Sequence, residues 1–247
     1  LNISGNNVSM SIFMTILYHL CMDKVVIVMP AWNEAENIKE MIDMLVNQEF
    51  PKINADMQLL VVGNYSKDAT DDIVKSASEK YKNVHFIQQG DKTGLGWGYI
   101  NGFKFAMEKL HADAVMEMDA DFQHPPRFVI PMVEAYLNGA DYVIGSRYVK
   151  GGSIPQSWAF FRKFVSYFGN LFIRIVLVKP QLHDMTTGFR LTRVKGVLDK
   201  IDLDNLMELK RFAHKVHLFY LATKNAKKIV EVPLQFAART KDVSKFD

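Results

Sequence analysis

The sequence predicts an α/β fold with a mainly parallel central sheet flanked by helices, and three observations predict it. Short β-branched runs alternate with helical stretches of roughly ten to fifteen residues, as in βαβ units. The first run, Val25–Met29, is apolar at every position, as expected for a strand covered by helices on both faces. Polar residues gather where strands are expected to end, and open α/β sheets bind their ligands at those ends.

The individual elements follow from these alternating patterns. Short runs rich in β-branched residues predict strands at Val25–Met29, Gln58–Val62, Val84–Gln88, Ala114–Met118, Tyr142–Gly145 and Ile229–Val232. Between them, apolar residues recur at helical spacing. These sets are Ala35, Ile38, Ile42 and Leu45; Ile73, Val74 and Ala77; Gly102, Phe103, Ala106 and Leu110; and Val129, Met132, Val133 and Tyr136.

Length, composition and charge favour one globular domain and exclude several functional classes. The chain has 247 residues, of which 49% are hydrophobic and 23% charged. The 30 Lys and Arg exceed the 27 Asp and Glu only slightly, and this net charge of +3 argues against a nucleic-acid partner. Because Cys21 is the sole cysteine, an internal disulfide, a CxxC pair and a cysteine-based zinc site are excluded, and a cytoplasmic location is expected.

Residues 1–21 differ from the remainder, and one domain is expected over residues 22–247. The stretch from Val8 to Cys21 is mostly apolar, but it is shorter than the ~20 residues that a spanning helix needs. No Lys or Arg precedes it, so it lacks the basic start of a signal peptide. Because Met22 is followed by Asp-Lys and then the first strand, we interpret Met22 as the natural start and residues 1–21 as an upstream extension that is not native. The alternative is an amphipathic arm that rests on a membrane.

The pattern with the most chemical content is Asp119-Ala120-Asp121, at the end of an expected strand. Two carboxylates around one small residue can hold Mg²⁺ or Mn²⁺ and leave positions for phosphate oxygens. Gln123 lies on the same side as Asp121 if the backbone stays extended, and its amide oxygen is a further candidate ligand. The alternative is a solvated acidic turn, because a lone Asp-x-Asp pattern is common.

Further motifs occur at intervals along the chain. They are Val28-Met29-Pro30-Ala31-Trp32-Asn33-Glu34, Gly94-Leu95-Gly96, Asp119 to Pro126, Gly145 to Gly152, Thr186-Thr187-Gly188-Phe189-Arg190, and Arg239 through Ser244-Lys245. In this order they resemble the family 2 glycosyltransferases, and most of all the dolichyl- or polyprenyl-phosphate mannose synthases. The resemblance covers roughly residues 24–246. It implies a GT-A type nucleotide-binding fold, with residues 22–247 as a single catalytic domain.

The resemblance also implies a role for each matching residue. The implied nucleotide-sugar-binding residues are Pro30, Ala31, Trp32, Glu34, Asn64, Asp119, Ala120, Asp121, Arg147, Arg239 and Lys245. Asp119, Asp121 and Arg147 are the implied catalytic residues, and Asp119, Asp121 and Gln123 the implied ligands of Mg²⁺ or Mn²⁺. A loop that ends in Ser244-Lys245 is expected to close over the diphosphate.

The implied reaction is an inverting transfer of a hexose from a nucleotide sugar to a polyprenyl or dolichyl phosphate. The expected sugar is mannose, donated by GDP-mannose, and the alternative is glucose, donated by UDP-glucose. The acceptor is a phosphate monoester that is largely ionised near pH 7, so it needs little help from a general base. A polyprenyl acceptor must be reached at a membrane, so we expect peripheral contact with the cytosolic face.

Two segments depart from the family pattern. Gly63 and Asn64 stand where paired aspartates usually follow the second strand, although Ser66, Asp68 and Thr70 remain. His217 stands where a carboxylate is expected on a helix. These losses motivate an alternative function, a catalytically weak or inactive homologue that binds the nucleotide sugar.

Two other sequence features bear on the function. An aromatic stripe with neighbouring basic residues runs from Gln156 to Val178, and it fits either a helix at a membrane interface or a helix packed on a core or a partner. The turn Gly94-Leu95-Gly96-Trp97-Gly98 lacks the full G-x-G-x-x-G spacing of a dinucleotide site and does not open the first βα unit. A nicotinamide oxidoreductase is therefore the remote alternative.

Overall fold

The structure, a computed structural model, describes residues 22–90, 94–207, 209 and 213–238. The expectations for residues 1–21, Arg239 and Ser244-Lys245 lie outside the described residues. The strands are β1 Lys24–Ala31, β2 Asp56–Gly63, β3 Val84–Gln88, β4 Ala114–Glu117, β5 Tyr142–Ser146, β6 Arg190–Arg193 and β7 Ile229–Pro233. The α-helices are α2 Ala35–Asp43, α3 Thr70–Lys80, α4 Leu95–Glu108, α5 Val129–Leu137, α6 Phe160–Val176 and α7 Ala213–Asn225.

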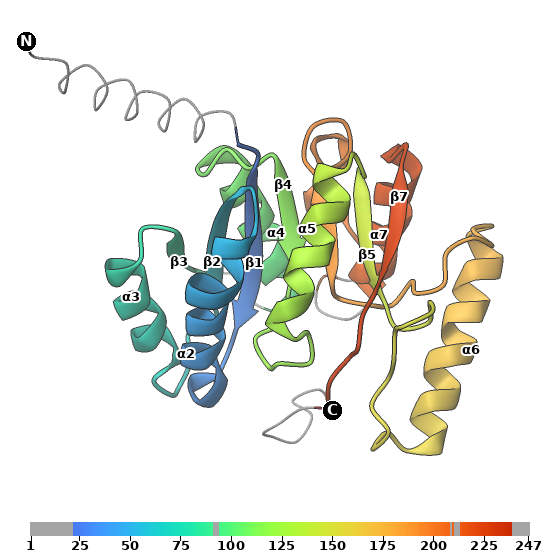
Figure 1. Cartoon of the computed structure of the whole chain (residues 1–247), viewed down its shortest axis with the longest axis horizontal. Coiled ribbons are helices and arrows are strands. Elements are labelled where there is room, and N and C mark those ends of the chain that lie inside the picture. The colour runs from blue at the N-terminus through green and yellow to red at the C-terminus, as the bar shows by residue number, and fades with distance from the viewer. Residues whose placement is uncertain (1–21, 91–93, 208, 210–212, 239–247) are drawn as a thin grey trace, which may run out of the picture.

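The strands form one seven-stranded sheet in the order β3-β2-β1-β4-β6-β5-β7 (Figure 1). β1, β2, β3 and β4 run parallel, and β7 runs parallel to β5. The mainly parallel sheet predicted from the alternating pattern is confirmed. Because β1 and β4 are neighbours, the loops that follow them leave the same edge of the sheet.

Helices cover both faces of this sheet, as the apolar pattern of the first strand predicts. Val25, Ile27 and Met29 of β1 belong to the core beneath α2, α3 and α5. Val26 and Val28 belong to the core shared with α4 and α7 on the opposite face. Figure 1 shows the two sets of helices on either side of the strands.

Strand β6 is the element that the sequence pattern does not reveal. It has only four residues, Arg-Leu-Thr-Arg, and so offers no long β-branched run. It inserts antiparallel between β4 and β5, where Glu117 and Ile144 both pair with Arg190. This insertion places a fully buried arginine below the loop that carries Asp119 and Asp121.

Helix α6 contrasts with the helices that cover the sheet. Of its residues only Asn170 is buried, whereas Phe161 and Phe172 are 75% and 68% exposed. Figure 1 shows the helix at one end of the molecule, apart from the layered core. The stripe therefore does not pack into the core of the described residues. Among those residues, no helix has both the length and the apolar character needed to cross a bilayer.

Candidate active site

The candidate site is built on the loop after β4, which carries Asp119 and Asp121. The Tyr99 hydroxyl on α4 donates a 2.7 Å hydrogen bond to Asp119 Oδ1. The Lys215 ammonium on α7 lies 4.0 Å from the same oxygen. Burial and the charge of Asp119 hold the pKa of Tyr99 well above its ordinary value, so this phenol remains a donor. Two distant helices thus meet at one carboxylate.

His124 closes the same loop as a neutral side chain. Its Nδ1 accepts a 3.1 Å hydrogen bond from the backbone N–H of Asp119. Burial lowers the pKa of His124 to about 4, and its ring stacks on Phe189 with centroids 5.0 Å apart.

Asp121 and Gln123 lie together in a tight turn. The backbone N–H of Gln123 donates a 3.2 Å hydrogen bond to Asp121 Oδ1, and Phe122 between them has a left-handed φ of 61°. Both side chains are buried. The Gln123 carbonyl accepts a 3.0 Å hydrogen bond from the Ala237 N–H, so the segment after β7 docks on this turn.

Arg147, expected to face phosphates, has a close protein partner. It follows β5, and its guanidinium donates two 2.7 Å hydrogen bonds to the two carboxylate oxygens of Asp184. Burial opposes both charges, but the mutual hydrogen bonds and attraction raise the pKa of Arg147 and lower that of Asp184. Arg147 also donates a 2.7 Å hydrogen bond to the Thr186 hydroxyl. Asp184 thus holds the Arg147 guanidinium in place.

The loops after β1 and β2 are joined by hydrogen bonds. The Ser66 hydroxyl accepts from the Asn33 N–H at 3.2 Å, and the Thr70 hydroxyl accepts from the Glu34 N–H at 2.8 Å. Asp68 accepts from the Ala35 N–H at 3.1 Å. Ser66, Asp68 and Thr70 therefore hold together the two loops that carry the expected nucleoside-pocket residues.

The expected pocket residues occupy these two loops. Pro30 and Ala31 end β1, and Trp32 follows them with 41% of its surface exposed. The Glu34 carboxylate accepts a 3.0 Å hydrogen bond from the Asn37 side chain. Asn64 directly follows β2 and is half-buried. The structure brings the two loops together, and the loop that carries Asp119 leaves the same edge of the sheet as the loop after β1.

Comparison with protein families decides the classification. Residues 26–199 match the family described as "Glycosyl transferase family 2". The chain belongs to glycosyltransferase family 2.

Curated relatives of this family 2 glycosyltransferase bear the names of mannosyltransferases. Dolichol-phosphate mannosyltransferase of Pyrococcus furiosus is 34% identical over 90% of this chain and 59% of the relative. Undecaprenyl-phosphate mannosyltransferase of Micrococcus luteus is 35% identical over 90% of this chain and 87% of the relative.

Solved structures support the same fold. Glucosyl-3-phosphoglycerate synthase of Mycobacterium tuberculosis with UDP has a TM-score of 0.60 and 16% identity over 92% of this chain and 75% of that chain. The same enzyme with Mn²⁺ and UDP-glucose has a TM-score of 0.60 and 17% identity over 92% and 74%. These likenesses confirm the expected GT-A fold of this glycosyltransferase. The match to the Pyrococcus relative spans less than two thirds of that protein's length.

The donor atoms of the glycosyltransferase site fit a hard divalent cation. Asp121 and Gln123 supply carboxylate and amide oxygens, and Asp119 lies two residues before Asp121. Mg²⁺ and Mn²⁺ at phosphate sites often use one or two carboxylates plus water and substrate oxygens. Among the described residues no cluster of three His, Cys, Asp or Glu side chains could hold a metal by itself. The arrangement suits a cation that the substrate helps to bind.

Several contributors to this site are not apparent from sequence motifs. Tyr99 and Lys215 come from helices distant in sequence, and no local pattern marks them. Glu117 and Arg190 are opposite one another on β4 and β6, both buried. Burial raises the pKa of Glu117, and the charges of Arg190 and Lys215 oppose that rise. The one available signal was Glu117 itself, a charge within an otherwise apolar strand.

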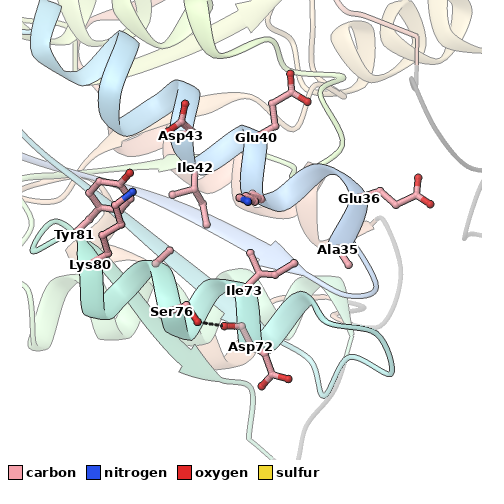
Figure 2. A pocket seen from close by; sticks show the side chains of 12 residues that line it. Ala35, Glu36, Glu40, Ile42, Asp43, Asp72, Ile73, Ser76, Lys80 and Tyr81 are labelled. Carbon is pink, nitrogen blue, oxygen red and sulfur yellow. Dashed lines mark hydrogen bonds between the residues drawn. The ribbon is translucent and has the colours of Figure 1, made fainter.

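A groove between α2 and α3 lies outside this site. Figure 2 shows Ile42 of α2 and Ile73 of α3 projecting into the space between the two helices. Charged side chains, including Glu36, Asp43 and Lys80, surround it. None of the residues expected to bind nucleotide, sugar or metal lines this groove. It therefore adds nothing to the assignment of the active site.

Proposed function

We propose that the chain transfers a hexose from a nucleotide sugar to a polyprenyl phosphate. The observation that carries this proposal is the Asp119-Ala120-Asp121 segment after β4, whose loop leaves the same edge of the sheet as the loop after β1. The names of the Pyrococcus and Micrococcus relatives support a lipid phosphate acceptor and mannose as the sugar. GDP-mannose is the proposed donor, and UDP-glucose is the alternative.

The proposed chemistry is a single displacement with inversion at the anomeric carbon. An ionised acceptor phosphate attacks that carbon, and the nucleoside diphosphate leaves. A divalent cation, when bound, supplies positive charge that stabilises the leaving diphosphate. Asp121 and Gln123 would hold that cation, and Asp119 would orient the donor. Because a phosphate nucleophile needs little deprotonation, no general base is assigned in the described site.

Helix α6 is proposed to rest on the membrane that carries the acceptor. Its exposed apolar residues include Phe161, Phe164, Phe168 and Phe172, and the helix contains no Asp or Glu. Its basic residues are Arg162, Lys163 and Arg174. An apolar face with flanking cations is the composition that inserts into the interface of an anionic bilayer.

The inward face of α6 connects this surface to the candidate site. The Asn170 side chain donates a 3.0 Å hydrogen bond to the Thr186 hydroxyl and accepts a 2.7 Å bond from the Met185 N–H. Thr186 also accepts a hydrogen bond from Arg147. The proposed membrane helix is therefore tied to the loop that carries the Arg147–Asp184 pair.

A nucleotide-sugar-binding homologue without turnover is the second candidate function. Gly63 stands where the family usually has an aspartate. A Cβ at that position would lie 2.9 Å from both the Phe86 ring and Gln88 Oε1. The side chain at His217 is likewise not a carboxylate, and its Nδ1 accepts a 3.1 Å bond from the Met207 N–H. These observations favour a site with altered donor binding.

Binding and transfer assays separate the two candidates. We expect GDP or UDP, or the matching sugar nucleotide, to raise the melting temperature, with a larger rise when Mn²⁺ is present. Asp121→Ala should abolish the metal-dependent part and reduce transfer to undecaprenyl phosphate by about 100-fold, as loss of an electrostatic catalytic group does. Glu79→Ala, an exposed change on α3, is the control. Binding without transfer supports the second candidate, and no binding contradicts both.

Vesicle binding tests the role of α6. The wild-type chain should sediment with vesicles of 70% phosphatidylcholine and 30% phosphatidylglycerol, and the double variant Phe161→Asp and Phe172→Asp should remain in the supernatant. Leu137→Asp, which changes an exposed apolar residue on α5, is the matched control and should sediment like the wild type. If the α6 double variant sediments as much as Leu137→Asp, the result would argue against a membrane contact through α6.

A further inference from the structure

Lys215 is an internal lysine whose charge faces the candidate metal site. Only 3% of its surface is exposed. Its ammonium lies 4.0 Å from Asp119 Oδ1 and 5.2 Å from the centre of the Tyr99 ring. A side chain at Gly188 would overlap this ammonium, because a Cβ there would meet Lys215 Nζ before any other atom. The loop at Gly188 thus leaves space that the lysine fills.

The backbone around Lys215 is also held in place. Arg190, fully buried on β6, donates a 2.7 Å hydrogen bond to the Lys215 carbonyl and a 2.9 Å bond to the Met185 carbonyl. These bonds connect the start of α7 with the loop that precedes β6. The surrounding fold therefore fixes the position of the ammonium. The ammonium of an exposed lysine, by contrast, moves freely.

The charges around Asp119 show why a cation is needed there. Glu117, Asp119 and Asp121 lie on the same strand and its loop, and two of them are nearly fully buried. Arg190 pairs with Glu117 in the strand register, and Lys215 lies beside Asp119. His124 Nδ1 accepts a hydrogen bond from the Asp119 N–H, and Arg147 is paired with Asp184. Lys215 is thus the cation whose ammonium lies nearest to Asp119 among the ion pairs of the described residues.

We propose that Lys215 is a positioning residue that neutralises Asp119 and leaves metal binding to Asp121 and Gln123. This inference rests on the proposed nucleotide-sugar site. If Lys215 has this role, the affinity for nucleotide should depend only weakly on the metal. The ammonium repels a second cation near Asp119, and it supplies positive charge to the same site when the metal is absent.

Calorimetric titrations of the full chain test this role with Mn²⁺ alone and with GDP and UDP, each with and without Mn²⁺. In Lys215→Gln, Mn²⁺ should bind about tenfold more tightly, and the gain in nucleotide affinity on adding Mn²⁺ should grow about tenfold, within the usual range of coupling between sites. Lys215→Arg keeps the charge and should retain values near those of the wild type. A merely structural role would weaken nucleotide binding equally with and without Mn²⁺, and that result would overturn the proposal.

A second variant reaches the same ammonium from the other side. Gly188→Ala should displace Lys215 Nζ from Asp119 without removing the charge, and it should change the Mn²⁺ affinity in the same direction as Lys215→Gln but by less. It keeps the test decisive if Lys215→Gln does not fold. Unchanged Mn²⁺ affinity in whichever of these variants folds would overturn the proposal.

The Mn²⁺ titration separates this proposal from the proposed function. If no nucleotide binds to any variant, the proposed function fails, and the Mn²⁺ affinities still decide the role of Lys215. If nucleotide binds and the metal coupling is the same in Lys215→Gln and the wild type, the proposed function stands and the role of Lys215 is refuted. Absence of Mn²⁺ binding in both the wild type and Lys215→Gln would also refute it.

Discussion

Two groups of loops at the carboxyl ends of the strands differ in what holds them. The loops around β4, β5 and β6 are held by charge: Asp119 is beside Lys215, and Arg147 is paired with Asp184. The loops after β1 and β2 are linked by hydrogen bonds, among them those that the hydroxyl groups of Ser66 and Thr70 accept from backbone N–H groups. We call them the charged loops and the hydroxyl-linked loops.

Their places in the sheet account for this difference. The charged loops follow strands in the middle and second half of the sheet, where β6 and α7 bring Arg190 and Lys215 beneath the site. Buried carboxylates are tolerated only where such cations and hydrogen bonds compensate their desolvation. The hydroxyl-linked loops lie toward the β3 edge, where Phe86 occupies the space beside Gly63. An aspartate at position 63 would therefore lack room there.

The largest expected effect comes from Asp184→Asn in the charged loops. The Arg147 guanidinium would stay buried without its counter-charge, so the free energy of unfolding should fall by about 3–5 kcal/mol. Urea denaturation at pH 7 measures this loss. Asp72→Asn, at an exposed carboxylate on α3, is the control and should change stability by less than about 0.5 kcal/mol.

The same variant has a defined pH dependence. The pKa of Asp184 in the folded chain lies below its ordinary value of 3.8, because the hydrogen bonds and charge of Arg147 outweigh the effect of burial. A lowered carboxyl pKa contributes stability that is present above 3.8 and lost as the pH falls through the folded pKa. The difference in the free energy of unfolding between the wild type and Asp184→Asn should therefore have its full value at pH 7 and become smaller below about pH 4. A difference that widens in acid would contradict the assigned ion pair.

The second prediction compares two substitutions at the end of β2. Gly63→Asp should destabilise the chain by about 1–3 kcal/mol, because its side chain must displace the Phe86 ring or Gln88. Asn64→Asp should leave stability nearly unchanged and raise nucleotide affinity by about fivefold, because charged hydrogen bonds are about twice as strong as neutral ones. Thermal melts and nucleotide titrations measure both effects.

The matched variant Gly63→Ala distinguishes space from charge at this position. It should lose stability as Gly63→Asp does if overlap with Phe86 is the cause. If Gly63→Asp is as stable as the wild type and binds nucleotide more tightly, the loops after β1 and β2 are not limited by space. The second candidate function would then lose its structural support.

The sequence predicted the framework of the fold well, for a physical reason. Strands such as Val84–Gln88 were predicted with their observed bounds, because apolar and β-branched runs mark buried parallel strands locally. Strand β6 was missed because four residues with two arginines show no such pattern. Its role is visible only when it pairs with β4 and places Arg190 against Glu117.

The candidate site was predictable only in part. The acidic turn Asp119-Ala120-Asp121 is a local motif, and its strand-end position follows from the βαβ pattern. Tyr99 and Lys215 reach Asp119 from other helices, so only the three-dimensional arrangement identifies them. Arg147 was expected to face phosphates, and the structure pairs it with Asp184. Its role in donor binding stays a prediction.

The smallest expected effect lies in the hydroxyl-linked loops. Thr70→Val leaves the Glu34 N–H without its 2.8 Å acceptor, and one neutral hydrogen bond contributes about 1 kcal/mol. Thr70→Ser keeps the hydroxyl and should retain most of that stability, so the pair isolates the bond from the change in shape. Urea denaturation should show a loss in the free energy of unfolding well below that of Asp184→Asn.

Because Glu34 directly precedes the helix beside the expected nucleoside pocket, Thr70→Val should also weaken nucleotide binding by a few-fold. An equal loss in Thr70→Ser would mean that packing around the methyl group, and not the hydrogen bond, joins the two loops.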